Sequence, residues 1–274
     1  LSDFDAARDA VPLEKMDALD RWALHQAARL VRECTAAYDA YEYHRVYQLC
    51  SQFCAVTLSA VYHDILKDRL YTAGAAHPLR RSSQTAIHHI FRALVKLLAP
   101  VLAFTADEAW AYHLLDADFA ANDAAASIHL EDWPEPPAAW TDDALDAGFA
   151  ALLKIRAQVT EAIEPHRAAG KIGKSLDAAV TITAAGETAA LLARHHALLP
   201  ELFIVSEVRL ATGGDPEAAA QIAVQHSQDL GRARCPRCWR WVPSLQSATH
   251  GDVCPRCADA LASSSKTQSS QNHG

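Results

Sequence analysis

Two Cys-x-x-Cys pairs constrain this chain more than any other feature of its sequence. They are Cys235-Pro-Arg-Cys238 and Cys254-Pro-Arg-Cys257, and fifteen residues separate them. This spacing is typical of a site in which two short knuckles each present two sulfurs to one tetrahedral Zn²⁺ ion. Because all four predicted ligands are thiolates, no coordination position stays open for water or substrate. We therefore expect one structural zinc ion rather than a catalytic one, with bound iron as the minor alternative.

Arginine and tryptophan are concentrated around these cysteine pairs. The formal net charge of the 274 residues is −8, which disfavours a protein that binds nucleic acid over its whole surface. From Asp229 to Arg256, however, five arginines stand against two aspartates, so the basic cluster coincides with the predicted metal module. Exposed Arg and Trp on a small zinc ribbon favour a role in recognition.

The other cysteines and the apolar content of the chain indicate in which cellular compartment the protein works. Cys34, Cys50 and Cys54 lie in a helical pattern with apolar neighbours, which predicts buried, reduced thiols in a cytosolic protein. A disulfide or a second metal site is the alternative. No run of eighteen apolar residues occurs, so we expect no membrane span. The first residues lack both an initiator Met and the features of a signal peptide, and we expect them to be the edge of a longer chain.

The apolar pattern predicts a mainly α fold that begins with an antiparallel helical bundle over residues 1–140. One helix is expected over 19–43 and a second over 44–71. A third is expected to start at an N-cap, Ser82 or Ser83, and to end at Leu98. Thr105 to Glu108 has the form of a capping box that opens a fourth, shorter helix.

The period of the pattern changes after a proline-rich crossover. Residues 141–228 predict a connecting helix and a small α+β unit, with strands over 178–183, 202–210 and 221–225. A zinc ribbon with four cysteine ligands is expected over 229–262. The Ser/Gln-rich residues 263–274 predict a disordered tail.

Several segments, taken in order, resemble the anticodon-binding helical domain of class I aminoacyl-tRNA synthetases. In the helical part they are Leu19-Asp-Arg-Trp22, Tyr62–Tyr71, Arg80–Thr85 and Leu98–Trp110. With Gly173–Val180 and the terminal Cys-Pro-Arg-Cys-Trp, the order resembles the carboxyl-terminal region of bacterial isoleucyl-tRNA synthetases. The resemblance covers nearly the whole chain except the tail. Valyl and leucyl relatives share the helical domain, and the paired cysteines favour the isoleucyl family.

This resemblance implies one part of an ATP-dependent ligase that attaches isoleucine to its tRNA. The family's signatures for ATP, His-x-Gly-His and Lys-Met-Ser-Lys-Ser, do not occur here. The catalytic core, with its ATP and Mg²⁺, and the editing domain are therefore expected outside this chain. The chain alone is expected to be inactive and to have no catalytic residue. The implied protein is a cytoplasmic monomer, and its partners are its own catalytic core and the anticodon stem-loop of isoleucine tRNA.

The resemblance also places two anticodon-contacting residues, Arg237 and Trp239, in the ribbon. Unpaired loop bases are recognised by aromatic stacking and by arginines on phosphates or base edges. The alternative for Trp239 is packing against the thin core of the ribbon, and Trp241 is more easily explained in that way.

Other arginines are candidates for phosphate contacts. They are Arg232, Arg234 and Arg240 in the ribbon, and Arg80 and Arg81 beside the loop at 72–79, where the anticodon stem could lie. Solubilising surface charge is the alternative for each. Lys67 and Arg69 are expected instead to pair with the nearby carboxylates of Asp64 and Asp68.

Two other functions remain open from the sequence. One is a protein-interaction module, in which the helical scaffold and ribbon dock another protein, and the acidic net charge favours it. The other is the same region of another branched-chain synthetase.

Overall fold

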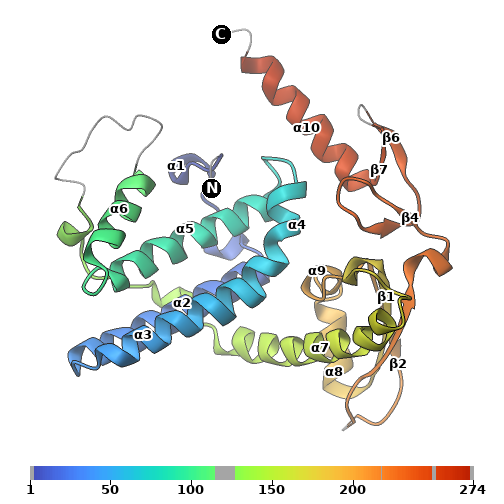
Figure 1. The fold of residues 1–274 in the computed structure, drawn as a ribbon, viewed down its shortest axis with the longest axis horizontal. Coiled ribbons are helices and arrows are strands. Elements are labelled where there is room, and N and C mark those ends of the chain that lie inside the picture. The colour runs from blue at the N-terminus through green and yellow to red at the C-terminus, as the bar shows by residue number, and fades with distance from the viewer. Residues whose placement is uncertain (1–2, 115–126, 217, 249–250, 272–274) are drawn as a thin grey trace. The chain divides into compact units, whose positions relative to one another are not determined.

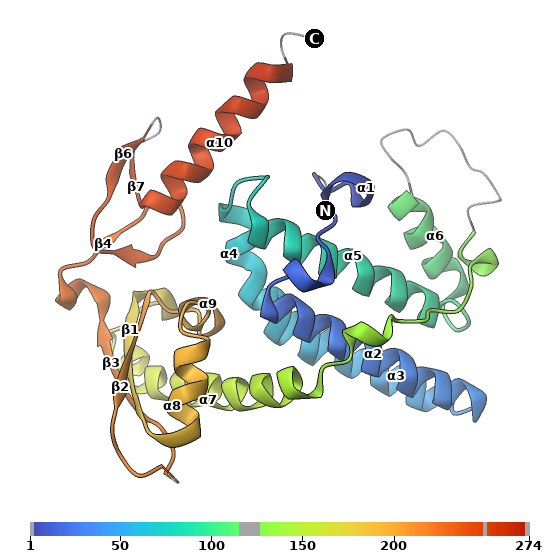
Figure 2. The same ribbon diagram turned by 180° about the vertical axis from the view of Figure 1, so that it is seen from behind.

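The computed structural model describes residues 3–114, 127–216, 218–248 and 251–271. It divides into two compact units, drawn in Figure 1 and seen from behind in Figure 2. Unit 1 comprises Leu1–Asp64 and Arg81–Asp143, and unit 2 comprises Ile65–Arg80 and Ala144–Gly274. The upper limit of unit 1 lies close to the expected boundary at 140. Residues 65–80 belong with the second unit, although the sequence placed them in the bundle.

Unit 1 is helical, as the sequence predicts. Asp17 caps its first long helix by accepting a hydrogen bond from the Leu19 amide at 3.1 Å, and that helix ends before Tyr41, whose φ is +56°. Its elements are α1 (Ala6–Asp9), η1 (Leu13–Lys15), α2 (Ala18–Asp39), α3 (Tyr43–Gln52), the π-helical η2 (Phe53–His63), α5 (Pro78–Leu98), α6 (Ala103–Leu114), η4 (Ile128–Leu130) and η5 (Ala138–Trp140).

One helical stretch of this bundle, Tyr43–Thr72, joins α3, η2 and α4 (Asp64–Thr72). Its length and composition are sufficient to cross a membrane, but a single such helix is weak evidence for a span. Val46, Phe53 and Leu58 are buried along it, so part of its apolar surface packs inside the protein, although only 33% of its apolar stretch is buried.

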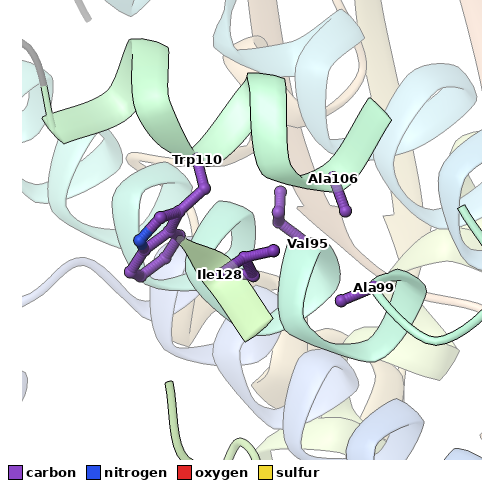
Figure 3. Close-up of a cluster of buried hydrophobic side chains, with 5 residues drawn as sticks. All are labelled: Val95, Ala99, Ala106, Trp110 and Ile128. Atoms are coloured by element: carbon purple, nitrogen blue, oxygen red, sulfur yellow. The ribbon is translucent and has the colours of Figure 1, made fainter. Parts of the chain in front are cut away.

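A small hydrophobic cluster fixes α6 to the end of α5 (Figure 3). Trp110 and Ala106 of α6 meet Val95 and Ala99, and Ile128 of η4 closes the cluster. Trp110 is 1% exposed, and Arg92 lies over its ring at 4.6 Å from the centroid. The short helix η4 is therefore packed against α5 and α6 through Ile128.

A buried carboxylate lies inside the bundle. Asp20 is fully buried in α2 and accepts hydrogen bonds from Tyr62 Oη at 2.6 Å, Ser82 Oγ at 2.5 Å and Ser83 Oγ at 2.9 Å. These contacts correct the prediction that Ser82 or Ser83 caps α5. The helix begins four residues earlier, at Pro78, and both serines are turned inward because Asp20 needs donors.

The capping box expected at Thr105–Glu108 is also absent, because α6 already starts at Ala103. Asp107 has a different role, since its Oδ1 accepts hydrogen bonds from Ser127 Oγ at 2.6 Å and from the Ile128 amide at 3.0 Å. The crossover segment is thereby attached to α6.

Unit 2 contains a three-stranded sheet with the order β2-β1-β3. The central strand β1 runs parallel to β2 and antiparallel to β3, with Val180 opposite Val208 and Val224. The elements are α7 (Asp143–Ala168), η6 (Ser175–Asp177), β1 (Ala178–Ala184), α8 (Gly186–Arg194), α9 (Leu199–Leu202), β2 (Glu207–Thr212), β3 (Gln221–His226) and η7 (Ser227–Leu230).

The strand expected over 202–210 starts later than predicted. Leu202 ends helix α9, Phe203 is its buried cap, and Ile204 has a φ of +56°. The start of the apolar run is therefore buried in a helical turn, and only Glu207–Thr212 forms strand β2.

The end of unit 2 contains two small hairpins and a helix. They are β4 (Ala233–Arg234) with β5 (Trp241–Val242), β6 (Gln246–Ala248) with β7 (Gly251–Val253), and α10 (Pro255–Gln271). Helix α10 continues to Gln271, past residue 263, where the sequence predicts the start of a disordered tail. No Gly or Pro follows Pro255 in this helix, so nothing in the sequence ends it. Residues 272–274 of the predicted tail lie outside the described residues.

Candidate metal centre

The two hairpins and the start of α10 position the four cysteines. In the first knuckle, the Cys235 amide donates to the Arg240 carbonyl and the Trp239 amide donates to the Cys235 carbonyl, both at 2.9 Å. These bonds close a tight loop between β4 and β5. In the second, Cys254 follows β7 directly, and Cys257 lies in the first turn of α10.

The four cysteine sulfurs lie close together. All four cysteines are buried, and their Sγ atoms lie within 4.8 Å of one another. The Sγ atoms of Cys238 and Cys254 are 3.7 Å apart. Zinc–sulfur bonds of about 2.3 Å in a tetrahedron require sulfurs about 3.8 Å apart, so this spacing fits. The amide of Cys254 also donates to the Sγ of Cys235 at 3.3 Å, as expected of a knuckle that stabilises thiolate. The four cysteines could therefore hold a metal ion.

The electrostatics of the cluster differ from one sulfur to the next. Burial would raise the pKa of Cys235, but the backbone amides of Cys238, Cys254 and Arg237 lower it to about 6. Burial raises the pKa of Cys238 and Cys257. Four thiolates repel one another in this small volume, so a bound cation is what makes the full set of charges stable.

Arginines of this module contact the end of helix α4. The Arg237 Nη1 atom donates to the Thr72 carbonyl at 2.5 Å and to the Sγ of Cys257 at 3.4 Å. Asp68 pairs with the guanidinium of Arg256 and, at 3.2 Å, with that of Arg240. Burial would raise the pKa of Asp68, but these two arginines lower it. Arg237 and Arg240, predicted to bind RNA, are thus also engaged within their own chain.

Trp239 is the exposed aromatic residue of the first knuckle. Half of its surface is exposed, and its φ is +64°, in the left-handed region that glycine favours. A bulky residue in this conformation costs about 1–3 kcal/mol, and such strain is found preferentially at functional sites. Packing in a thin core therefore does not explain Trp239. The ammonium of Lys174 lies 4.6 Å from the centroid of its ring.

Trp241, by contrast, joins the module to the sheet. Its Nε1 donates to Asp177 Oδ1 at 2.9 Å, its amide donates to Ser206 Oγ at 2.8 Å, and its ring meets that of His226 edge-on. The packing role that the sequence favoured for Trp241 is the one the structure supports.

The remaining basic candidates have different environments. Arg232 binds Glu207 through two nitrogens, at 2.9 and 3.1 Å, whereas Arg234 is exposed on β4. Arg80 donates to the Ala73 carbonyl at 3.1 Å. Arg81 donates to the carbonyl of Asp3 at 2.8 Å. None of these contacts tests a role in binding RNA, which stays a prediction for each arginine.

The predicted pairing of Arg69 within the chain is confirmed, but with another partner. Its guanidinium binds Glu201 through two bonds of 2.6 and 2.9 Å. Sequence reasoning also missed Lys174 and Asp177, which lie at the first knuckle in the structure. The only feature of the local sequence that could have pointed to Lys174 is the basic turn before β1. Asp177 could not be found in this way, because its partner Trp241 lies 64 residues later in the chain.

Comparison with known proteins identifies the family. The model of the "anticodon-binding domain of tRNA ligase" matches residues 20–182, more than half of the chain. The isoleucine–tRNA ligase of Syntrophotalea carbinolica is 40% identical over 267 residues, which is 95% of this chain and 28% of that protein. The isoleucine–tRNA ligases of Geobacter sulfurreducens and Thermotoga maritima are 39% and 37% identical, each with 95% of this chain and 28% of the relative covered. The chain thus spans little more than a quarter of the length of these relatives. It belongs to the family of anticodon-binding domains of tRNA ligases.

Proposed function

We propose that this chain is the tRNA-recognition part of an isoleucine–tRNA ligase and that it holds the anticodon stem-loop of isoleucine tRNA. The family match supports binding of an anticodon. The relatives named above are all isoleucine–tRNA ligases, and their similarity to this chain covers 95% of it. The observation that carries the proposal is Trp239, which the cysteine cluster presents to solvent in a strained conformation. Stacking on an exposed indole is a usual way to bind an unpaired base.

The metal of the cluster is proposed to be one structural Zn²⁺ ion held by Cys235, Cys238, Cys254 and Cys257. Four buried cysteine sulfurs within 4.8 Å of one another suit zinc better than divalent ions that prefer oxygen ligands. The ion would fix the two knuckles and thereby the position of Trp239. It would take no part in chemistry, because its four ligands leave no open position.

The rest of the ligase reaction is assigned to parts of the protein beyond this chain. ATP and Mg²⁺ would act in a catalytic core, which is the second proposed partner besides the tRNA. The chain alone is expected to form no aminoacyl-adenylate. We propose a monomer in the cytoplasm, where tRNA charging takes place.

The candidate arginines divide by what they already contact. Arg234 is exposed and is the first candidate for a phosphate, together with Trp239 for a base. Arg237, Arg240, Arg80 and Arg81 each make contacts within the chain, so an RNA phosphate would have to share or replace those contacts.

Substitution of Trp239 tests the proposal. Trp239→Ala should weaken binding of the isoleucine anticodon stem-loop about 5- to 150-fold in a fluorescence-anisotropy titration, the loss expected from about 1–3 kcal/mol of stacking. Tyr47→Ala, which removes another aromatic side chain that is 72% exposed, is the control and should bind as the wild type does. Equal affinity of Trp239→Ala and wild type would reject Trp239 as the base-stacking residue and would favour a protein-docking role for the module.

A further inference from the structure

We propose that Lys174 is a further RNA-contacting residue, which covers the Trp239 ring in the free protein and moves to a phosphate when a nucleobase takes its place. This inference rests on the proposed function and adds a residue to it. The ligand class is one nucleotide of single-stranded RNA, with its base on the indole and its phosphate on the ammonium.

The first observation is the geometry of the pair. The Lys174 ammonium lies 4.6 Å from the centroid of the Trp239 ring, within the range of a cation–π interaction. Both residues are exposed, the tryptophan over half of its surface. The ammonium therefore occupies a face of the ring on which a base would otherwise stack.

The second observation is the attachment of Lys174 to the knuckle. The Lys174 amide donates to Asp177 Oδ2 at 2.8 Å, and Asp177 Oδ1 accepts the indole N–H of Trp241 at 2.9 Å. Trp241 lies two residues after Trp239, and its amide is held by Ser206 Oγ at 2.8 Å. One carboxylate thus fixes the backbone of the lysine and the strand that follows Trp239. These anchors hold the backbone of Lys174 close to the strand that follows Trp239.

The third observation is the charge of Lys174. Within the part of the chain that the structure describes, no carboxylate forms an ion pair with its ammonium, although the net charge of the chain is −8. An ammonium whose only described partner is an aromatic face keeps its charge available to a phosphate. Arg234 is a second exposed cation of this module. It lies on β4, opposite Trp241 of β5.

The exchange is favourable in both of its parts. A cation–π contact at an exposed site is weaker than the stacking of a base on an aromatic ring, so a base displaces the ammonium. The displaced ammonium has a flexible four-carbon stem and three donors, which suit a nearby phosphate oxygen. Neutralising that phosphate releases counterions, and the binding constant then depends more steeply on salt.

The experiment is a salt titration of Lys174→Met binding to the isoleucine anticodon stem-loop. The slope of log K against log salt should become shallower by about 0.7, the value for one phosphate contact in single-stranded RNA. Affinity should fall by a similar factor for the isoleucine loop and for a loop with a swapped anticodon, because a phosphate contact carries no base information. Lys174→Arg should restore the slope. Lys171→Met, an exposed lysine of the same segment, is the matched control and should keep the wild-type slope.

Two results would overturn the inference. An unchanged slope in Lys174→Met would show that the ammonium meets no phosphate, and tighter binding would show that it only blocks the ring. Equal zinc content in Lys174→Met and wild type confirms that the module is folded. Failure of the proposed function looks different, because the wild type would then show no preference for the isoleucine loop.

Discussion

Replacement of Asp20 by alanine should destabilise the helical bundle of unit 1 strongly. Its carboxylate is fully buried and accepts three hydroxyl donors at 2.5–2.9 Å, one from Tyr62 and two from Ser82 and Ser83. A hydrogen bond to a charged group contributes about 1.5–3 kcal/mol, and buried donors left without an acceptor add a desolvation penalty. Part of this sum is offset because the variant no longer buries a charge, and we expect a loss of about 4 kcal/mol.

Single removal of the donors calibrates this value. Tyr62→Phe removes one of these hydroxyl donors and should cost about 1.5 kcal/mol. Asp39→Ala removes an exposed aspartate from the end of the same helix and should change stability by less than about 0.5 kcal/mol. Urea unfolding followed by circular dichroism at 222 nm measures all three variants. If Asp20→Ala unfolded at the same urea concentration as Asp39→Ala, the buried carboxylate would not organise the bundle and the reasoning would be refuted.

Two further variants test other parts of unit 2. Cys254→Ser should lose the bound zinc, measured by metal analysis, and most of the affinity for the isoleucine stem-loop, while helical circular dichroism stays largely intact, since the ribbon has too little apolar surface to fold without its metal; full affinity without zinc would exclude the ribbon from recognition. Glu207→Gln tests the ion pairs with Arg209 and Arg232. Burial would raise the pKa of Glu207, but these arginines lower it, so its stabilising effect is present above the usual glutamate pKa and is lost as pH falls through the lowered one. On thermal scans the variant should melt at a lower temperature than the wild type at pH 7, and the difference should shrink as pH falls below the usual glutamate pKa. A difference that stays constant with pH would show that Glu207 does not contribute to the pH dependence.

Local patterns in the sequence predicted the elements whose chemistry is local. The Cys-x-x-Cys spacing predicted one cluster of four cysteines, and the structure brings these sulfurs within 4.8 Å of one another. The helical periods likewise predicted the bundle. In both cases, residues a few positions apart carry enough information to specify the geometry.

Predictions failed where the partner of a residue lies far away in the chain. Ser82 has the composition of an N-cap, but its partner is Asp20, 62 residues earlier. The run from Leu202 has the composition of a strand, but burial of Leu202 and Phe203 begins with a helical turn. A local preference of about 1 kcal/mol does not outweigh a buried charge that needs donors or a buried aromatic side chain.

The same reason explains the mixed outcome for the basic residues. Composition showed a cluster of arginines around the metal centre but not what each one contacts. Arg237 and Arg240 contact helix α4 through Thr72 and Asp68, and 165 positions of sequence separate Arg237 from Thr72. Trp239 was predicted to contact RNA from the resemblance and from the stacking of unpaired bases on aromatic rings; the structure shows that it is exposed and has a positive φ, and its role stays a prediction.

Anticodon recognition through the zinc module is tested most directly by binding of this chain to two RNA hairpins. One is the anticodon stem-loop of isoleucine tRNA, the other carries a swapped anticodon, and each is titrated by fluorescence anisotropy with zinc bound and after its removal by a chelator. We predict tighter binding to the isoleucine loop, with the preference lost when zinc is removed. Equal binding to both loops that disappears at moderate salt would contradict anticodon recognition and would leave only attraction between the arginines and phosphate.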